Sequence, residues 1–71
     1  MTAQQERVLA YLREYGSITS READRAIAVT RLASRICELR QMGINIKKVE
    51  VKSKNRYGEK VRFARYVIEE D

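Results

Sequence analysis

The sequence predicts an α+β fold in which three short helices precede a long β-hairpin. Up to residue 42 the apolar residues recur every three to four positions, which is the helical period. After Gly43 they alternate with polar residues, which is the strand period. The three glycines, at positions 16, 43 and 58, each fall where such a segment should end, and proline is absent. With 71 residues the chain has the length of one domain, which we expect over residues 1–71.

The first helix is expected over residues 3–15. Thr2 and Gln5 have the spacing of a capping box, in which each side chain accepts from the backbone N–H of the other residue. Apolar residues follow at helical spacing, and Gly16 supplies the left-handed residue that commonly ends a helix.

A second helix is expected over residues 20–27. Thr19 and Glu22 repeat the capping box directly before it. Ile18 is an isolated apolar residue between the two helices, and it is compatible with a short strand.

A third helix is expected over residues 31–42, with Thr30 as its N-cap. Its buried stripe consists of Leu32, Ile36 and Leu39.

The hairpin is expected over residues 44–68, with a polar stretch in its middle as the turn. The apolar alternation changes parity between Ile46 and Val49, which predicts a β-bulge near residues 47–48. Phe63, in the returning strand, is expected in the core.

The charge is distributed unevenly along the chain. Residues 1–29 contain four basic and four acidic residues, whereas residues 30–68 contain eleven basic and three acidic residues, a net charge of +8. A solvated basic surface would account for this excess, but so would binding to a polyanion such as nucleic acid.

The order of the elements favours nucleic acid. Three helices with a short second helix and a tight turn before the third make a helix-turn-helix, and a hairpin that follows is the wing of a winged helix-turn-helix. In this arrangement the third helix enters the major groove of DNA. The residues expected on its outer side are Thr30, Arg31, Ser34, Glu38 and Gln41, and Arg35 is expected on the flank, for contact with a base or a phosphate.

Arg31 and Ser34 are the first candidates for contact with base edges, because the N-terminal residues of a recognition helix reach deepest. Glu38 has three interpretations: it could accept from cytosine, pair with Arg35, or repel phosphate. The alternative for the whole side is a solvated helix surface with internal ion pairs.

Further contacts are expected outside the third helix. The hairpin turn is surrounded by residues suited to phosphates or to the minor groove, namely Lys52, Lys54, Asn55, Arg56, Tyr57 and Lys60. Ser20 and Arg21, at the start of the second helix, are expected on the DNA backbone. A lysine-rich hairpin edge also protects against aggregation, which is the alternative interpretation of these cations.

Other classes of function find no support in the sequence. Histidine is absent and Cys37 is the single cysteine, so no metal site, disulfide or nucleophile–base pair is expected. The sequence contains no glycine-rich phosphate loop and no apolar run of membrane-spanning length. We therefore expect a cytoplasmic protein that is not an enzyme and has no cofactor and no small-molecule ligand.

Three segments resemble a known family. They are RLASRICELRQMGI at residues 31–44, SITSREA at 17–23 and YVI at 66–68. Together they are similar to the small winged helix-turn-helix DNA-binding domains of bacteria and their phages, and the resemblance covers nearly the whole chain. It implies DNA binding in the bacterial cytosol or nucleoid, often in phage or prophage regulation. Ile44 stands where an aromatic residue is common in that family, and the wing is longer and more basic.

The sequence thus predicts a double-stranded DNA-binding protein that regulates transcription or recombination, either as a homodimer on DNA or with a protein partner. Two alternatives remain: a protein-interaction module on the same scaffold, and binding to RNA or to a non-B-form duplex. An interaction module would be expected to expose apolar residues on its third helix.

Overall fold

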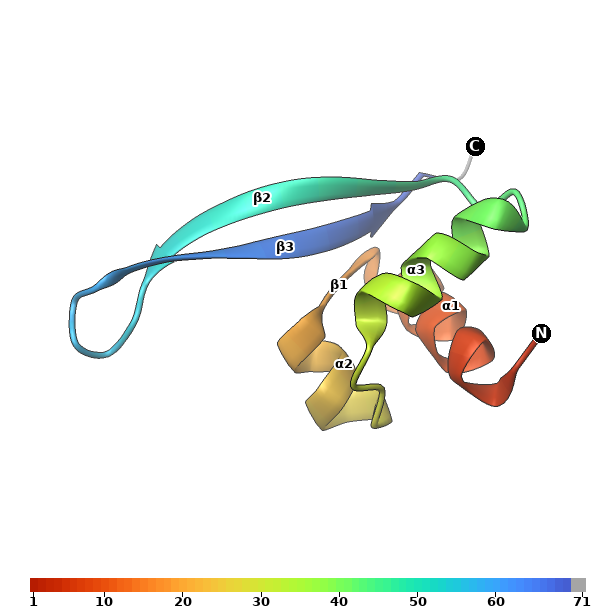
Figure 1. The fold of residues 1–71 in the computed structure, drawn as a ribbon, viewed down its shortest axis with the longest axis horizontal. Helices are drawn as coiled ribbons and strands as arrows, with labels where there is room; N and C mark the ends of the chain where they lie inside the picture. The colour runs from red at the N-terminus through yellow and green to blue at the C-terminus, as the bar shows by residue number, and fades with distance from the viewer. Residues whose placement is uncertain (70–71) are drawn as a thin grey trace.

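The computed structural model describes residues 1–69. Figure 1 shows the helices gathered at one end of the molecule, while a hairpin runs over them and projects well beyond them. The overall dimensions are 40 × 25 × 20 Å. The elements, in chain order, are α1 (Ala3–Tyr15), β1 (Ser17–Thr19), α2 (Ser20–Ile27), α3 (Leu32–Gln41), β2 (Ile46–Lys54) and β3 (Lys60–Ile68).

Local sequence signals set the bounds of the first two helices, which span the ranges that the sequence predicts. Thr2 with Gln5, and Thr19 with Glu22, both form complete capping boxes. Gly16 ends α1 with a φ of 85°. The short strand expected around Ile18 is also present, as β1.

The end of α2 has an unusual backbone. Ala28 adopts the left-handed conformation, with a φ of 56° and a ψ of 43°. A Cβ atom is strained in this region, and glycine is the residue that usually occupies it. The tight turn allows Val29, which is fully buried, to enter the core directly after the helix, and its N–H donates to the carbonyl of Ala23 at 3.0 Å.

The start of α3 differs from the expectation. Arg31, not Thr30, is the N-cap residue, and no side chain caps the helix. The helix is also one residue shorter at each end than predicted. The buried Val29 just upstream fixes the path of the chain, and Thr30 is left exposed in the connecting bend.

The three strands form an antiparallel sheet in the order β1-β3-β2. The β2–β3 register is unbroken from Ile46 opposite Ile68 to Lys54 opposite Lys60, so the predicted bulge near residues 47–48 is absent. The change in parity has another cause: the apolar residues after Ile46 lie on the opposite face of the hairpin from Ile46.

This change of face also overturns the prediction for Phe63. It lies opposite Val51 in the register, on the face that turns away from the helices at the base of the hairpin, and it is 39% exposed. Phe63 is therefore a surface residue of the wing.

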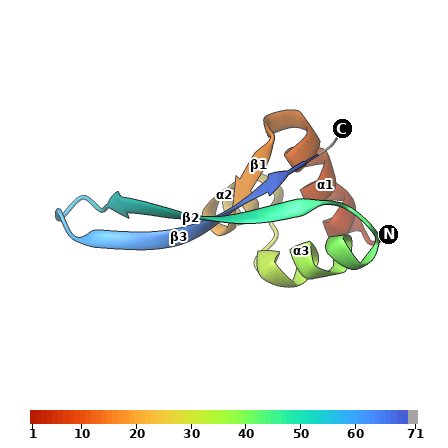
Figure 2. The same ribbon diagram turned by 90° about the horizontal axis from the view of Figure 1, so that it is seen from above.

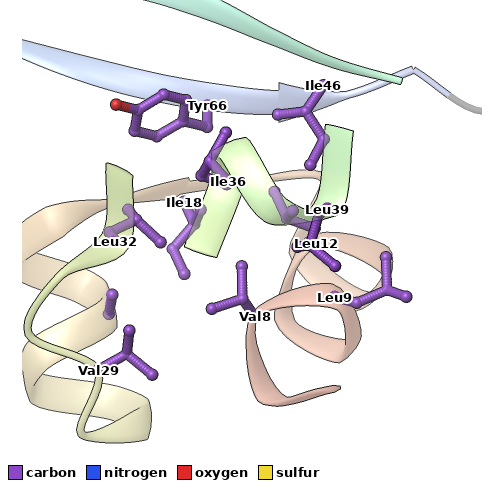
Figure 3. Packing of buried hydrophobic residues seen from close by; sticks show 11 residues of the cluster. Val8, Leu9, Leu12, Ile18, Val29, Leu32, Ile36, Leu39, Ile46 and Tyr66 are labelled. Atoms are coloured by element: carbon purple, nitrogen blue, oxygen red, sulfur yellow. The ribbon is translucent and has the colours of Figure 1, made fainter. Parts of the chain in front are cut away.

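The core lies between the helices and the base of the hairpin. Figure 3 shows Tyr66 and Ile46 pointing from the sheet towards Ile36 and Leu39 of α3, with Leu12 of α1 on the far side. All five residues are buried. This packing fixes α3 against the base of the hairpin and leaves the outer half of the hairpin without a helix beneath its cationic side chains.

Candidate nucleic-acid interface

The outer side of α3 is a mixed surface of small and polar residues. Its buried stripe is the predicted one, Leu32, Ile36 and Leu39. Of the predicted contact residues, Thr30, Arg31 and Gln41 are exposed and Ser34 is half-buried. Ala33 and Cys37 border this side, and both are exposed. The side exposes no large apolar residue before Met42, which is the C-cap.

Arg35 and Glu38 are directed towards α1. The Arg35 Nε atom lies 2.9 Å from Glu38 Oε1, and its Nη1 donates to Gln4 Oε1 at 2.8 Å. Glu38 Oε1 also accepts from Gln5 Nε2 at 2.8 Å. Of the three interpretations of Glu38, the structure contains the ion pair with Arg35. Both side chains join α3 to α1 and are less available to a ligand than the sequence suggests.

Arg40 is a basic residue that the sequence analysis did not select. On a helical wheel it lies close to Ile36, which suggests a position beside the core. In the structure it is exposed, and its Nε donates to the carbonyl of Ile46 at 2.9 Å. The contact places a guanidinium at the junction of α3 and β2. In the sequence, its positive charge was the available signal, whereas its place on the helical wheel pointed towards the core.

The wing has two chemically different faces. One face has the same parity as Ile46 and Tyr66, and it carries six of the eight charged residues of β2 and β3, while Lys47 and Arg65 lie on the other face. We call this the cationic face: Lys48, Lys52 and Lys54 of β2, Lys60 and Arg62 of β3, and Glu50. The other is the apolar face: Val49, Val51, Val61 and Phe63.

Like charges lie directly opposite one another on the cationic face. Lys52 pairs with Arg62 in the register, and Lys54 pairs with Lys60. The one acidic residue there, Glu50, lies 3.6 Å from Arg62 with both side chains largely exposed. Opposed like charges destabilise an antiparallel pair of strands. The hairpin of the free protein is therefore destabilised by electrostatic repulsion, which the phosphates of a bound polyanion would reduce.

The wing turn is organised by Asn55. Its Oδ1 atom accepts from the N–H groups of Tyr57, at 2.9 Å, and of Glu59, at 3.1 Å. Gly58 provides the positive φ of the turn, 78°. The side chain of Asn55 is thus engaged in the turn, whereas those of Arg56 and Tyr57 are exposed at its tip.

Ser20 and Arg21 are exposed in the first turn of α2. They do not join the outer side of α3. Instead they line a groove together with residues of the wing, among them Lys54 and Phe63.

The described residues contain no cluster of acidic, cysteine or histidine side chains that could hold a metal ion. Within the same residues, no helix is long and apolar enough to cross a membrane.

An exposed polar helix on a three-helix core, beside a hairpin with a cationic face, defines the helix-turn-helix class of nucleic-acid-binding domains. The chain belongs to the winged helix-turn-helix domain family, whose model matches residues 3–71. Membership of this family indicates DNA binding. No curated protein and no solved structure matches the chain significantly.

Proposed function

We propose that this protein binds double-stranded DNA with α3 in the major groove and the cationic face of the wing on the adjacent backbone or minor groove. The observation that carries the proposal is the presence of two pairs of opposed like charges, Lys52 with Arg62 and Lys54 with Lys60. A surface that only needed solubility would gain from alternating charges, whereas phosphates turn this repulsion into attraction.

The outer side of α3 supports the same proposal. Arg31, Ser34 and Gln41 offer donors and acceptors to base edges, and Arg40 adds a cation beside the hairpin. The small residues Ala33 and Cys37 leave room for the helix to approach a groove closely. The lack of a large apolar patch on this side argues against the rival interpretation as a protein-interaction helix.

The family resemblance supports a finer role, as a transcription or recombination regulator of phage or prophage type. Because one domain of this kind makes a small interface, we propose that it pairs with a second copy or a partner on DNA. Its place of action would be the compartment that holds the DNA. Ser20 and Arg21 would contact the backbone beside the major groove.

An NMR titration of ¹⁵N-labelled protein with a random-sequence duplex of about 16 base pairs tests the proposal. Amide shifts are expected at Arg31, Ser34, Arg40 and the Arg56–Tyr57 tip. They should fade with added salt, because about five to eight phosphate contacts make affinity fall steeply. No shifts at low salt, or equal shifts with duplex RNA, would overturn it.

A further inference from the structure

A groove lies beside the apolar face of the wing, and Lys54 of the cationic face also lines it. It has a volume of about 540 Å³ and runs between the first turn of α2 and the outer half of the hairpin. In Figures 1 and 2 the hairpin twists as it passes over α2. This twist brings the apolar face, with Val61 and Phe63, into the lining of the groove beside Ser20 and Arg21. The volume is that of a site that holds a ligand or a short peptide segment.

One edge of β3 is open along this groove. β1 pairs with β3 only as far as Thr19 opposite Arg65, because the chain then turns into α2. The Ile68 N–H donates towards β1, to Gly16, and successive residues of a strand turn their backbone groups to opposite sides. The backbone N–H and C=O groups of Arg62 and Ala64 therefore point to the same edge of β3 as those of Ile68. Beside Arg62 and Ala64, the described residues provide no partner strand at this edge.

The side chains of the groove combine an apolar floor with a basic rim. Phe63 is 39% exposed, and Val61 beside it is half-buried. Arg21 and Lys54 form no ion pair within residues 1–69. The one acidic residue of the lining is Glu22.

Glu22 does not neutralise this rim. Its carboxylate accepts from the Thr19 N–H at 2.9 Å and lies 3.4 Å from Arg65 Nη1, which also donates to Ser17. The capping box and Arg65 thus engage Glu22, and the two free cations at the rim determine the charge of the groove.

We propose that this groove binds an extended acidic peptide of another protein, which adds to the open edge of β3 as a further strand. Its backbone would pair with Arg62 and Ala64, its apolar side chains would cover Phe63 and Val61, and its carboxylates would meet Arg21 and Lys54. Charge complementarity selects an acidic partner, and the apolar floor selects one that alternates acidic with apolar residues. The inference does not rest on DNA binding, because the open edge of β3 and the floor formed by Phe63 and Val61 are separate from the proposed DNA contacts; of the side chains that would meet the peptide, only Arg21 and Lys54 belong to both surfaces.

The first test uses the full chain without DNA and a peptide of about ten residues in which Glu and Val alternate. Amide shifts are expected at Ser20, Arg21 and Phe63, with slower hydrogen exchange at Arg62 and Ala64 as these amides gain partners. The same peptide with Lys in place of Glu should cause neither change. Shifts confined to Lys52, Lys60 and Arg62, without slower exchange, would mean attraction to the cationic face alone and would overturn the proposal.

Two matched pairs of variants localise the site. Phe63→Thr should weaken peptide binding about tenfold, while Val49→Thr should leave it unchanged. Val49 is the matched control because it lies on the same face, is 38% exposed and does not line the groove. Arg21→Gln should weaken binding about threefold and Arg25→Gln, at the other end of α2, should not.

The wild-type peptide affinity is the reference, and circular dichroism checks that each variant is folded. Equal losses within either pair would overturn the proposal. A loss of DNA binding in these variants would not, because peptide affinity is measured without DNA.

Discussion

Lys54 lies directly opposite Lys60 at the outer end of the wing, and neither forms an ion pair within the described residues. Two ammonium groups on directly opposed residues of an antiparallel pair repel each other in the free protein. The arrangement therefore links the stability of the hairpin to its ligand, and removal of one lysine should have opposite effects on folding and on DNA binding.

Lys60→Thr should raise the free energy of unfolding by a few tenths of a kcal/mol, because threonine suits a strand and the repulsion is gone. The same variant should lower DNA affinity and reduce the slope of log K against log salt by about 0.9, the loss of one phosphate contact. Urea denaturation and fluorescence anisotropy measure the two effects. Lys47→Thr, on the opposite face, is the control and should not gain stability by relief of this repulsion.

Ala28→Gly should stabilise the protein, by about 0.5–1 kcal/mol, because glycine adopts the left-handed conformation without strain. Ala28 is exposed, so the substitution removes no core contact. Ala26→Gly is the matched control: it is also exposed, but it lies inside α2, where glycine should cost about 1 kcal/mol. Thermal unfolding followed by circular dichroism distinguishes them, and equal shifts in Tm would contradict the strain at Ala28.

Glu38→Ala should lower the free energy of unfolding by about 1 kcal/mol, because it leaves Gln5 and the half-buried Arg35 without their shared acceptor. A double-mutant cycle with Arg35→Ala should give a coupling energy of at least a few tenths of a kcal/mol. Glu50→Ala provides the comparison, since its contact with Arg62 is long and exposed and should contribute little. Additive effects of Arg35 and Glu38 would show that the two side chains do not stabilise the protein as a pair.

Asn55 and Arg56 are neighbours with different expected roles. Asn55→Ala removes two hydrogen bonds of the turn and should lower stability by about 1 kcal/mol. Arg56→Ala should leave stability unchanged and weaken DNA binding. Hydrogen exchange of the Tyr57 and Glu59 amides reports on the turn, and anisotropy reports on binding. Similar stability losses in both variants would contradict this division.

Several features could be predicted from the sequence because residues close together in the chain determine them. The capping boxes at Thr2 and Thr19 and the left-handed residue Gly16 act over a few residues, and they set the bounds of α1 and α2. The buried stripe of α3 follows from the helical period in the same way. The basic excess of residues 30–68 is a matter of composition and needs no structure.

The tertiary structure decided which neighbour each side chain meets. The wheel placed Arg35 and Glu38 on the flank and outer side of α3, but the position of α1 gives them Gln4 and Gln5 as partners. The parity change after Ile46 is compatible with a bulge or with a change of face. The sequence could not distinguish these, because the choice depends on where the helices end beneath the sheet. The helices cover only the base of the hairpin (Figure 1), so the apolar side chain of Phe63 lies on the surface. The β2–β3 register continues past Ile46 without a bulge.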